Sequence, residues 1–233
     1  MAATADLASY YKDHQFEFGF ASLCHMGIPN DLAGKTVLDI GCRRGKGVVK
    51  FSERVGATGK AIGIDWSPEY IDICLEYMDG AWQRNGLPEN NMQFILGYPE
   101  ALDEYGIEDN SIDFIYLNSS LWLMADPWKV LAQVARVLKP GGMLSAEVVL
   151  ANAERDQQVV EAARKIGNSI QSAPFIDEFM TYMRGLGFNE PDVREHMPVP
   201  PHLGYKQGYE VEVIPNDELA IFEATVIYFT KAN

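Results

Sequence analysis

The sequence has little positive charge. It holds 19 lysine and arginine residues against 33 aspartate and glutamate residues, which gives a formal net charge of -14. A surface with this balance repels the phosphates of nucleic acids and the anionic headgroups of membranes, and it attracts cationic ligands. We therefore expect neither a nucleic acid nor a membrane to be a partner.

Long apolar runs are also missing from the start of the chain. Its first 15 residues include Asp6, Lys12, Asp13 and His14. They show neither the apolar core of a secretory signal nor the length of a membrane anchor. We therefore expect a cytoplasmic protein.

Cysteine is scarce and proline-rich sequence is short. Cys24, Cys42 and Cys74 are widely separated in the sequence, form no C-x-x-C pair and make an odd number, which does not describe a disulfide framework. Free thiols are expected, and no metal ligands are predicted. The stretch 198–201 is too short for an interdomain linker, so we expect it to form a loop.

What the sequence does contain is an alternation of apolar runs with amphipathic segments. Apolar, β-branched runs predict strands, and apolar residues spaced three and four apart predict helices. The predicted strands cover residues 36–41, 61–64, 92–96, 112–117, 143–150, 189–194 and 219–229, and the predicted helices cover 48–55, 68–78, 127–138, 156–170 and 174–186. Helices between successive strands indicate a parallel sheet covered on both faces. No helix separates the last two strands, so we expect them to pair antiparallel at one edge.

The length of 233 residues and the apolar content of 47% suit one domain. Within residues 1–233 we expect a helical cap over 1–30, a ligand-binding core over 31–150, and a C-terminal region of helices, edge strands and a loop over 151–233.

A glycine-rich loop, residues 41–47, follows the first predicted strand. In an open parallel sheet, ligands bind at the carboxyl ends of the strands. Gly41 and Gly45 let the backbone approach a ligand closely, and a helix that begins near Gly45 directs free N–H groups toward it. Steric demands of the turn alone would also account for these glycines.

Asp65 ends the second predicted strand, about two dozen residues after Gly41. A carboxylate at this position is placed to accept hydrogen bonds from the hydroxyls of an adenosine ribose. The alternative is that Asp65 caps the following helix, although Ser67 is available for that purpose.

Two features resemble class I S-adenosylmethionine-dependent methyltransferases and not dehydrogenases: the predicted turn Leu138-Lys139-Pro140-Gly141-Gly142 and the paired strands at the C-terminus. Segments 94–102, 109–113 and 118–123 also resemble the arsenite methyltransferase family and related quinone C-methyltransferases, and the resemblance runs from about residue 10 to the end. It implies a Rossmann-like α/β fold with a mostly parallel seven-stranded sheet, an antiparallel C-terminal edge and an N-terminal helical cap. It also implies S-adenosyl-L-methionine as the cofactor.

The resemblance implies a set of cofactor-binding residues in three groups. One group lines the methionine half, one holds the ribose and the adenine, and one residue lies at the sulfonium end. In that order they are Asp39, Gly41, Cys42, Arg43 and Gly45; Asp65, Trp66, Tyr98 and Glu100; and Asn118.

The chain departs from the family pattern at two positions within these segments, Arg43 and Pro99. Arg43 stands where the loop usually has a second glycine, so either the backbone path differs or a guanidinium reaches the methionine carboxylate. Lys46, close by, is expected to be a solvated charge. Pro99 lacks the N–H that commonly meets an adenine ring nitrogen, so adenine recognition must use other groups.

Arsenite methyltransferases bind the metalloid through cysteine thiolates, the soft ligands that it prefers. The corresponding positions here read Asn118-Ser119 and Gly167-Asn168-Ser169, without cysteine, so arsenite is not the expected acceptor. Candidate catalytic residues are Tyr11 and His25, because the cap covers the cofactor in relatives. His14, His196, His202 and Tyr10 are further candidate bases. Trp122, Met124 and 197–205 are expected to shape an apolar acceptor pocket, although core packing would also account for Trp122.

We therefore predict an enzyme that transfers a methyl group from S-adenosylmethionine to a small-molecule acceptor. Two alternatives remain open at this stage. One is a protein of the same fold that binds the cofactor without turnover, and the other is a nicotinamide-dependent oxidoreductase. The sequence predicts neither the acceptor atom nor the oligomeric state.

Overall fold

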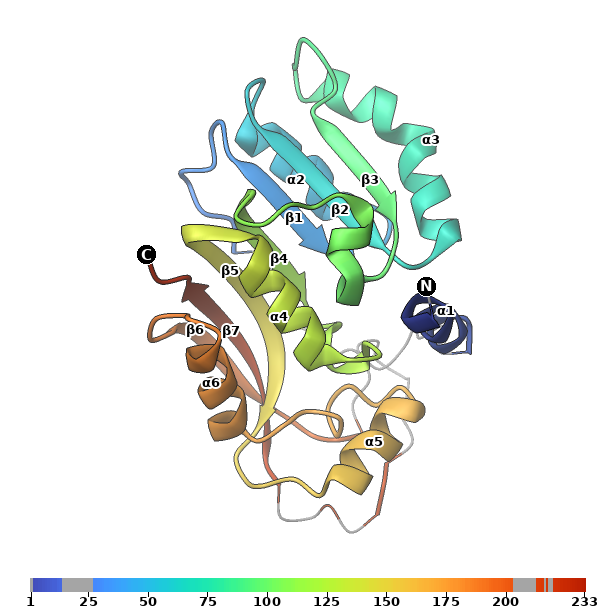
Figure 1. The fold of residues 1–233 in the computed structure, drawn as a ribbon, viewed down its shortest axis with the longest axis vertical. Helices are drawn as coiled ribbons and strands as arrows, with labels where there is room; N and C mark the ends of the chain where they lie inside the picture. The colour runs from blue at the N-terminus through green and yellow to red at the C-terminus, as the bar shows by residue number, and fades with distance from the viewer. Residues whose placement is uncertain (1, 14–26, 203–212, 216, 218–219) are drawn as a thin grey trace. The chain divides into compact units, whose positions relative to one another are not determined.

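A computed structural model describes residues 2–13, 27–202, 213–215, 217 and 220–233. Its strands form one seven-stranded sheet in the order β3-β2-β1-β4-β5-β7-β6 (Figure 1). In chain order the elements are α1 (Ala2–Asp13), β1 (Thr36–Ile40), α2 (Lys46–Val55), β2 (Lys60–Asp65), α3 (Pro68–Arg84), β3 (Met92–Leu96), η1 (Pro99–Tyr105), β4 (Ile112–Asn118), η2 (Leu121–Leu123), α4 (Pro127–Val137), β5 (Leu138–Ala151), α5 (Gln157–Lys165), α6 (Ile176–Gly185), β6 (Asp192–Val199) and β7 (Phe222–Thr230). No helix among these residues is long and apolar enough to cross a membrane.

The strand directions confirm the predicted fold class. β1 pairs in parallel with β2 and β4, and β2 pairs in parallel with β3. β6 and β7 pair antiparallel. The result is the Rossmann-like fold of class I methyltransferases, a mostly parallel sheet with an antiparallel C-terminal edge.

The chain groups into two compact units. The β1–β4 unit comprises Met26–Leu117, Ala132–Ser145 and Thr230–Asn233, and the β6–β7 unit comprises Met1–His25, Asn118–Leu131 and Ala146–Phe229. The single domain over 1–233 stays a prediction.

The core of the β1–β4 unit follows from the hydrophobic periodicity of α2. Val48, Phe51 and Val55, spaced three and four residues apart, are buried on one face of this helix. α2 and α3 pack against β1, β2 and β3. α3 begins as predicted, with Pro68 in its first turn and the Ser67 side chain accepting a hydrogen bond from the Tyr70 N–H at 3.4 Å.

The predicted turn at Lys139-Pro140-Gly141-Gly142 is wrong, because these residues lie within β5. Gly141 donates to the Lys231 carbonyl and the Lys231 N–H donates to the Gly142 carbonyl, both at 2.9 Å. Gly141 has a φ of 74°, a conformation that glycine adopts without strain. The glycines therefore let the chain begin pairing here, and α4 ends at Val137, directly before the strand.

The predicted loop at 198–201 is wrong in its first half, since Pro198 and Val199 belong to β6. Proline is tolerated there because β6 is the last strand in the sheet order, and an edge strand leaves some N–H groups without a ladder partner. The helix predicted over 156–170 is also shorter than expected. α5 ends at Lys165, and the turn beyond it is held by the Asn168 carboxamide, which accepts from Ile170 and Gln171.

A buried polar network organises the β6–β7 unit. The Arg155 guanidinium pairs with the Asp217 carboxylate, with side chains 2% and 10% exposed. Gln171 donates to Asp217 Oδ2 at 2.9 Å and accepts from the Ile214 N–H at 2.7 Å. Arg155 also donates to the Gln171 and Ala173 carbonyls. One cation thus links the segment before α5, the segment after it and Asp217.

Removing one partner of this network should destabilise the fold strongly. We expect Asp217→Ala to lower the free energy of unfolding by about 3–5 kcal/mol, because it leaves the Arg155 charge buried without its partner. Urea denaturation measures the change. The control is Asp31→Ala, which removes an exposed ion pair with Lys35 and should change the free energy of unfolding far less, because solvent screens such pairs. Equal losses in the two variants would contradict the assignment.

Candidate functional site

The loop between β1 and α2 is a tight turn anchored on β2. The N–H groups of Gly41 and Cys42 both donate to the Ile64 carbonyl, at 2.9 and 3.2 Å, and the Gly45 N–H donates to the Cys42 carbonyl at 2.9 Å. Gly41, Arg43 and Gly45 have φ values of 71°, 48° and 70°. Arg43 therefore keeps the left-handed conformation that glycine would take, at a cost of about 1 kcal/mol.

The Arg43 side chain is directed at α3. Its Nη2 lies 3.3 Å from the Tyr70 hydroxyl, and its guanidinium carbon lies 5.5 Å from the centre of the Tyr70 ring. The Arg44 guanidinium approaches the same ring at 5.2 Å, while Lys46 is exposed. The sequence left two alternatives for Arg43, a changed backbone path or a guanidinium that reaches the ligand. This geometry favours neither, because the backbone keeps the conformation that glycine would take and the guanidinium contacts Tyr70. Sequence reasoning missed Tyr70, whose only signal is its place in the first turn of α3.

Asp65 ties the turn to the end of β2. Its Oδ2 accepts from the Arg43 N–H at 2.8 Å and its Oδ1 accepts from the Ser67 N–H at 2.9 Å. The side chain that caps α3 is that of Ser67. Asp65 therefore does not cap the helix, and its carboxylate binds N–H groups of residues that precede the helix. Each carboxylate oxygen can accept more than one hydrogen bond, so the two N–H contacts leave capacity for donors on a ligand.

Asp39 and Asp65 form a pair of buried acids near the ends of neighbouring strands. They are 5% and 1% exposed. Burial, and then the negative charge of Asp65, raise the pKa of Asp39 to about 8. Burial also raises the pKa of Asp65 to about 6, against the lowering effect of the Ser67 and Arg43 N–H groups. Such acids favour a ligand that brings hydroxyl donors or a positive charge, because either compensates for lost hydration.

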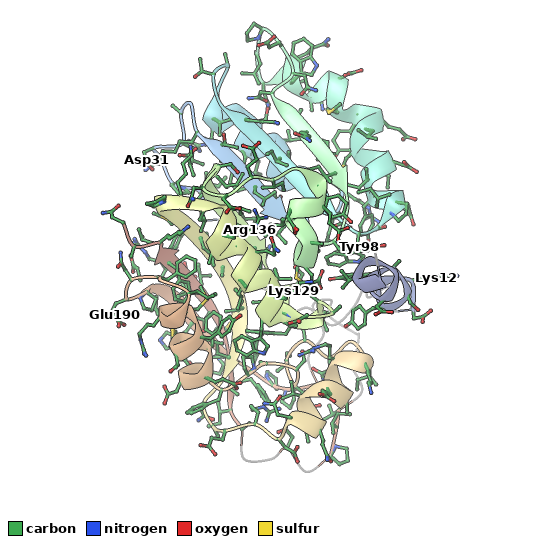
Figure 2. The ribbon with its side chains drawn as sticks, viewed as in Figure 1. Lys12, Asp31, Tyr98, Lys129, Arg136 and Glu190 are labelled. Atoms are coloured by element: carbon green, nitrogen blue, oxygen red, sulfur yellow. The ribbon has the colours of Figure 1, made fainter. Side chains whose placement is uncertain are left out.

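The end of β3 supplies the next part of the same sheet edge. The Gly97 N–H donates to the Asp65 carbonyl at 2.9 Å, and Tyr98 precedes η1 (Figure 2). Tyr98 is half-buried and Glu100 is fully buried. Pro99 occupies the first position of η1, where its missing N–H is not needed by the helix.

Nine of the ten predicted cofactor-binding residues therefore follow or end β1, β2 and β3 within the β1–β4 unit. Hydrogen bonds connect the turn directly to Asp65. Half-buried Trp66 lies beside it in sequence. The nine are Asp39, Gly41, Cys42, Arg43, Gly45, Asp65, Trp66, Tyr98 and Glu100.

Asn118, the tenth, belongs to the β6–β7 unit and starts a second polar cluster. The Ser119 hydroxyl lies 3.0 Å from Asn118 Oδ1 and 3.3 Å from Glu147 Oε1, and the Ser119 N–H donates to the Glu147 carbonyl at 2.8 Å. Ser119 has a φ of 55°. Glu147 is 2% exposed. The sequence analysis did not identify it, and the available signal is that it is the one acidic residue in the largely apolar segment 144–150.

The predicted catalytic residues are only partly described. Tyr11 is buried in α1, against Tyr10, whose hydroxyl donates to the Leu123 carbonyl at 2.9 Å. His25 and His14 lie outside the described residues. His196, on β6, and His202 are exposed.

Trp122 is a core residue of the β6–β7 unit. Its indole N–H donates to the Val149 carbonyl at 2.7 Å, and its ring packs against Trp128 and Phe179. Of the two sequence-based interpretations, core packing accounts for these contacts.

Comparisons with known proteins bear on this site. The model of a family described as "Methyltransferase domain" matches residues 31–187. The arsenite methyltransferase of Homo sapiens is 30% identical over 168 residues, covering 72% of this chain and 45% of that protein. The 27-O-demethylrifamycin SV methyltransferase of Amycolatopsis mediterranei is 27% identical over 205 residues, covering 83% of this chain and 70% of that protein.

The solved structure of an arsenic(III) S-adenosylmethionine methyltransferase from Chlamydomonas reinhardtii is similar to this chain, with a TM-score of 0.75 and 27% identity. The similarity covers 99% of this chain and 72% of that one. The chain spans about half the length of the arsenite methyltransferases that it matches among curated proteins, 45% and 50% in two of them.

The raised pKa of Asp39 predicts a pH-dependent stability. Asp39 ionises near pH 3.8 in the unfolded chain and near pH 8 in the folded chain, so its contribution to stability is full below the first value and is lost as pH rises through the second. Between pH 5 and pH 8, the free energy of unfolding should fall in the wild type by at least about 1.4 kcal/mol more than in Asp39→Asn, the value of one pKa unit.

Urea denaturation at both pH values measures this difference. The control variant Asp31→Asn should keep the wild-type slope, because an exposed contact with Lys35 lowers the pKa of Asp31 and keeps it ionised throughout the window. Parallel slopes for the wild type and Asp39→Asn would contradict the assignment.

Proposed function

Because this chain belongs to the class I S-adenosylmethionine-dependent methyltransferase family, we propose that it transfers a methyl group from this cofactor to a small-molecule acceptor. The observation that carries the proposal is the contact between the Arg43 N–H and the Asp65 carboxylate. It brings the glycine turn after β1 and the acid that ends β2 to one place, at the carboxyl edge of a parallel sheet, where α/β folds bind nucleotides.

The residues of the β1–β4 unit fit the cofactor chemically. S-adenosylmethionine offers two ribose hydroxyls, an α-ammonium group and a sulfonium that carries the transferable methyl group. Asp65 would accept from the ribose hydroxyls through its remaining lone pairs. Asp39 and the turn at Gly41 would face the methionine half, where positive charge stabilises the ionised form of a carboxyl whose pKa is raised. Trp66 and Tyr98 would pack against the adenine.

Transfer requires an in-line approach of the acceptor to the methyl carbon, so positioning suffices where the acceptor is already nucleophilic. We place the acceptor near Asn118, which ends β4, and Ser119, which follows it, with Tyr11 and His25 of the N-terminal region as candidate catalytic residues. A base is needed only for an acceptor that must lose a proton.

The acceptor we propose is a small organic molecule and not arsenite. Ser119 and Ser169 stand where thiolates would be needed, and serine hydroxyls are poor ligands for a thiophilic centre. The similar proteins named above include one that methylates a metalloid and one that methylates an organic hydroxyl. An organic acceptor is therefore within the range of these relatives.

Replacing Asp65 tests the cofactor site. Asp65→Ala should weaken the binding of S-adenosylhomocysteine by about 1–3 kcal/mol, roughly 5- to 150-fold in Kd, because hydrogen bonds to a charged group are lost. Isothermal titration calorimetry measures this effect. The control is Asp72→Ala, which removes the same charge from an exposed position on α3. An unchanged Kd in Asp65→Ala would remove this residue from the site.

Turnover is tested separately with methyl-labelled S-adenosylmethionine. Label should move to a member of a pool of phenols, amines, thiols and quinones, and arsenite should accept none. Binding without transfer to any acceptor would support a binding protein without turnover. Tight binding of NAD(P), with no binding of S-adenosylhomocysteine, would support an oxidoreductase, and labelled arsenite would overturn the choice of acceptor.

A further inference from the structure

Two cysteines that are 32 positions apart in the sequence meet under the glycine turn. Cys42 follows Gly41 in the turn and Cys74 lies on the buried face of α3. Their side chains lie close enough for each thiol to shift the pKa of the other. Both sulfurs also approach the Arg43 carbonyl, at 4.0 Å from Cys42 and 3.2 Å from Cys74. Both cysteines are free, and they are 6% and 0% exposed.

Two glycines leave the space that the sulfurs fill. A Cβ atom on Gly45 would lie 2.9 Å from Cys74 Sγ, and a Cβ atom on Gly63 would lie 2.8 Å from Cys42 Sγ. Both distances are too short for a real contact, so any larger residue at either glycine would displace a thiol. The local backbone is therefore compatible with a close thiol pair only because these positions are glycine.

The pair is chemically asymmetric. The Cys42 thiol lowers the pKa of Cys74, whereas the Cys74 thiol, together with burial, raises the pKa of Cys42. Cys74 is thus the more acidic of the two thiols. A thiolate beside a second thiol is the arrangement from which disulfides form, because the thiolate reacts with an oxidant and the neighbouring sulfur resolves the product.

We propose that Cys42 and Cys74 are a reversible redox modification site, which a peroxide converts to a disulfide that weakens cofactor binding. The Cys74 thiol loses its proton and its sulfur attacks one peroxide oxygen, the O–O bond breaks, and sulfenic acid forms while the other oxygen takes up the proton and leaves as water. The Cys42 sulfur then attacks the sulfenic sulfur, the S–S bond forms, and a second water leaves. Two thiols lose two electrons and two protons, and one peroxide is reduced to two waters.

The expected effect on cofactor binding depends on which of the two cysteines moves when the disulfide forms. A disulfide needs its sulfurs about 2.05 Å apart, closer than any hydrogen bond between thiols. Cys74 is held in a 17-residue helix, whereas Cys42 lies in a turn. The turn must therefore shift, and with it Arg43, whose N–H holds Asp65. This consequence rests on the proposed cofactor site, and bound cofactor should in turn protect the thiols that the turn covers.

The experiment uses Cys24→Ser as the background, so that only the two described thiols remain. After treatment with hydrogen peroxide, the intact mass should fall by two hydrogen atoms. A tryptic digest should contain peptide 36–43 joined to peptide 61–84. Calorimetry should show S-adenosylhomocysteine binding weakened by about fivefold or more, the usual range of a coupling between two sites, with recovery after dithiothreitol. Pre-bound S-adenosylhomocysteine should slow formation of the linked peptide.

Cys74→Ser in the same background is the matched control. It should bind S-adenosylhomocysteine like its parent and lose the response to peroxide. Absence of the linked peptide, or a linked protein whose Kd equals that of the reduced protein, overturns the proposal. Failure of the reduced protein to bind S-adenosylhomocysteine would instead refute the cofactor site and, with it, the regulatory effect, while the peptide map still decides whether the pair oxidises.

Discussion

The interaction on which the β1–β4 unit depends is the double hydrogen bond of Asp65. Its two oxygens hold the N–H groups of Arg43 and Ser67, so one side chain joins the turn after β1, the end of β2 and the start of α3. Without these acceptors, the backbone N–H of a residue in a left-handed conformation would have to find another partner. The cost of burying the carboxylate is thus offset by these hydrogen bonds, and Asp65 ends a strand at the edge where ligands bind in such sheets.

The same edge concentrates groups that are unfavourable in the absence of a ligand. Asp39 has its pKa raised to about 8, and Arg43 takes a conformation that suits glycine. Away from the edge, the same unit is ordinary, with β-branched strands and an α2 face spaced for burial. A residue in a glycine-like conformation beside an acid with a raised pKa is expected where a protein is preorganised for binding. The cofactor of the family carries hydroxyls and positive charge, so family membership explains why buried acids would be kept at this edge.

The β6–β7 unit shows the same separation between structure and site. The pair of Arg155 and Asp217 is buried and fully engaged with backbone carbonyls and Gln171, and its purpose is to hold irregular segments together. Asn118, Ser119 and Glu147 form a smaller cluster at the end of β4, again with a residue in the left-handed region. Some polar groups in this unit therefore stabilise the fold and others form part of the candidate site, and composition does not distinguish these two roles.

The sequence by itself determined the order of the seven strands and of helices α2 to α6, the parallel sheet with its antiparallel edge, and the start of α3 at Ser67 and Pro68, because hydrophobic periodicity and capping act over a few residues. It also located the glycine turn and Asp65. Tertiary structure alone decided that Arg43 rests on Tyr70, that Glu147 meets Ser119, that glycines 141 and 142 enter β5, and that Cys42 meets Cys74. Each of these joins residues distant in sequence or replaces a local preference with strand pairing, so no local pattern contains them.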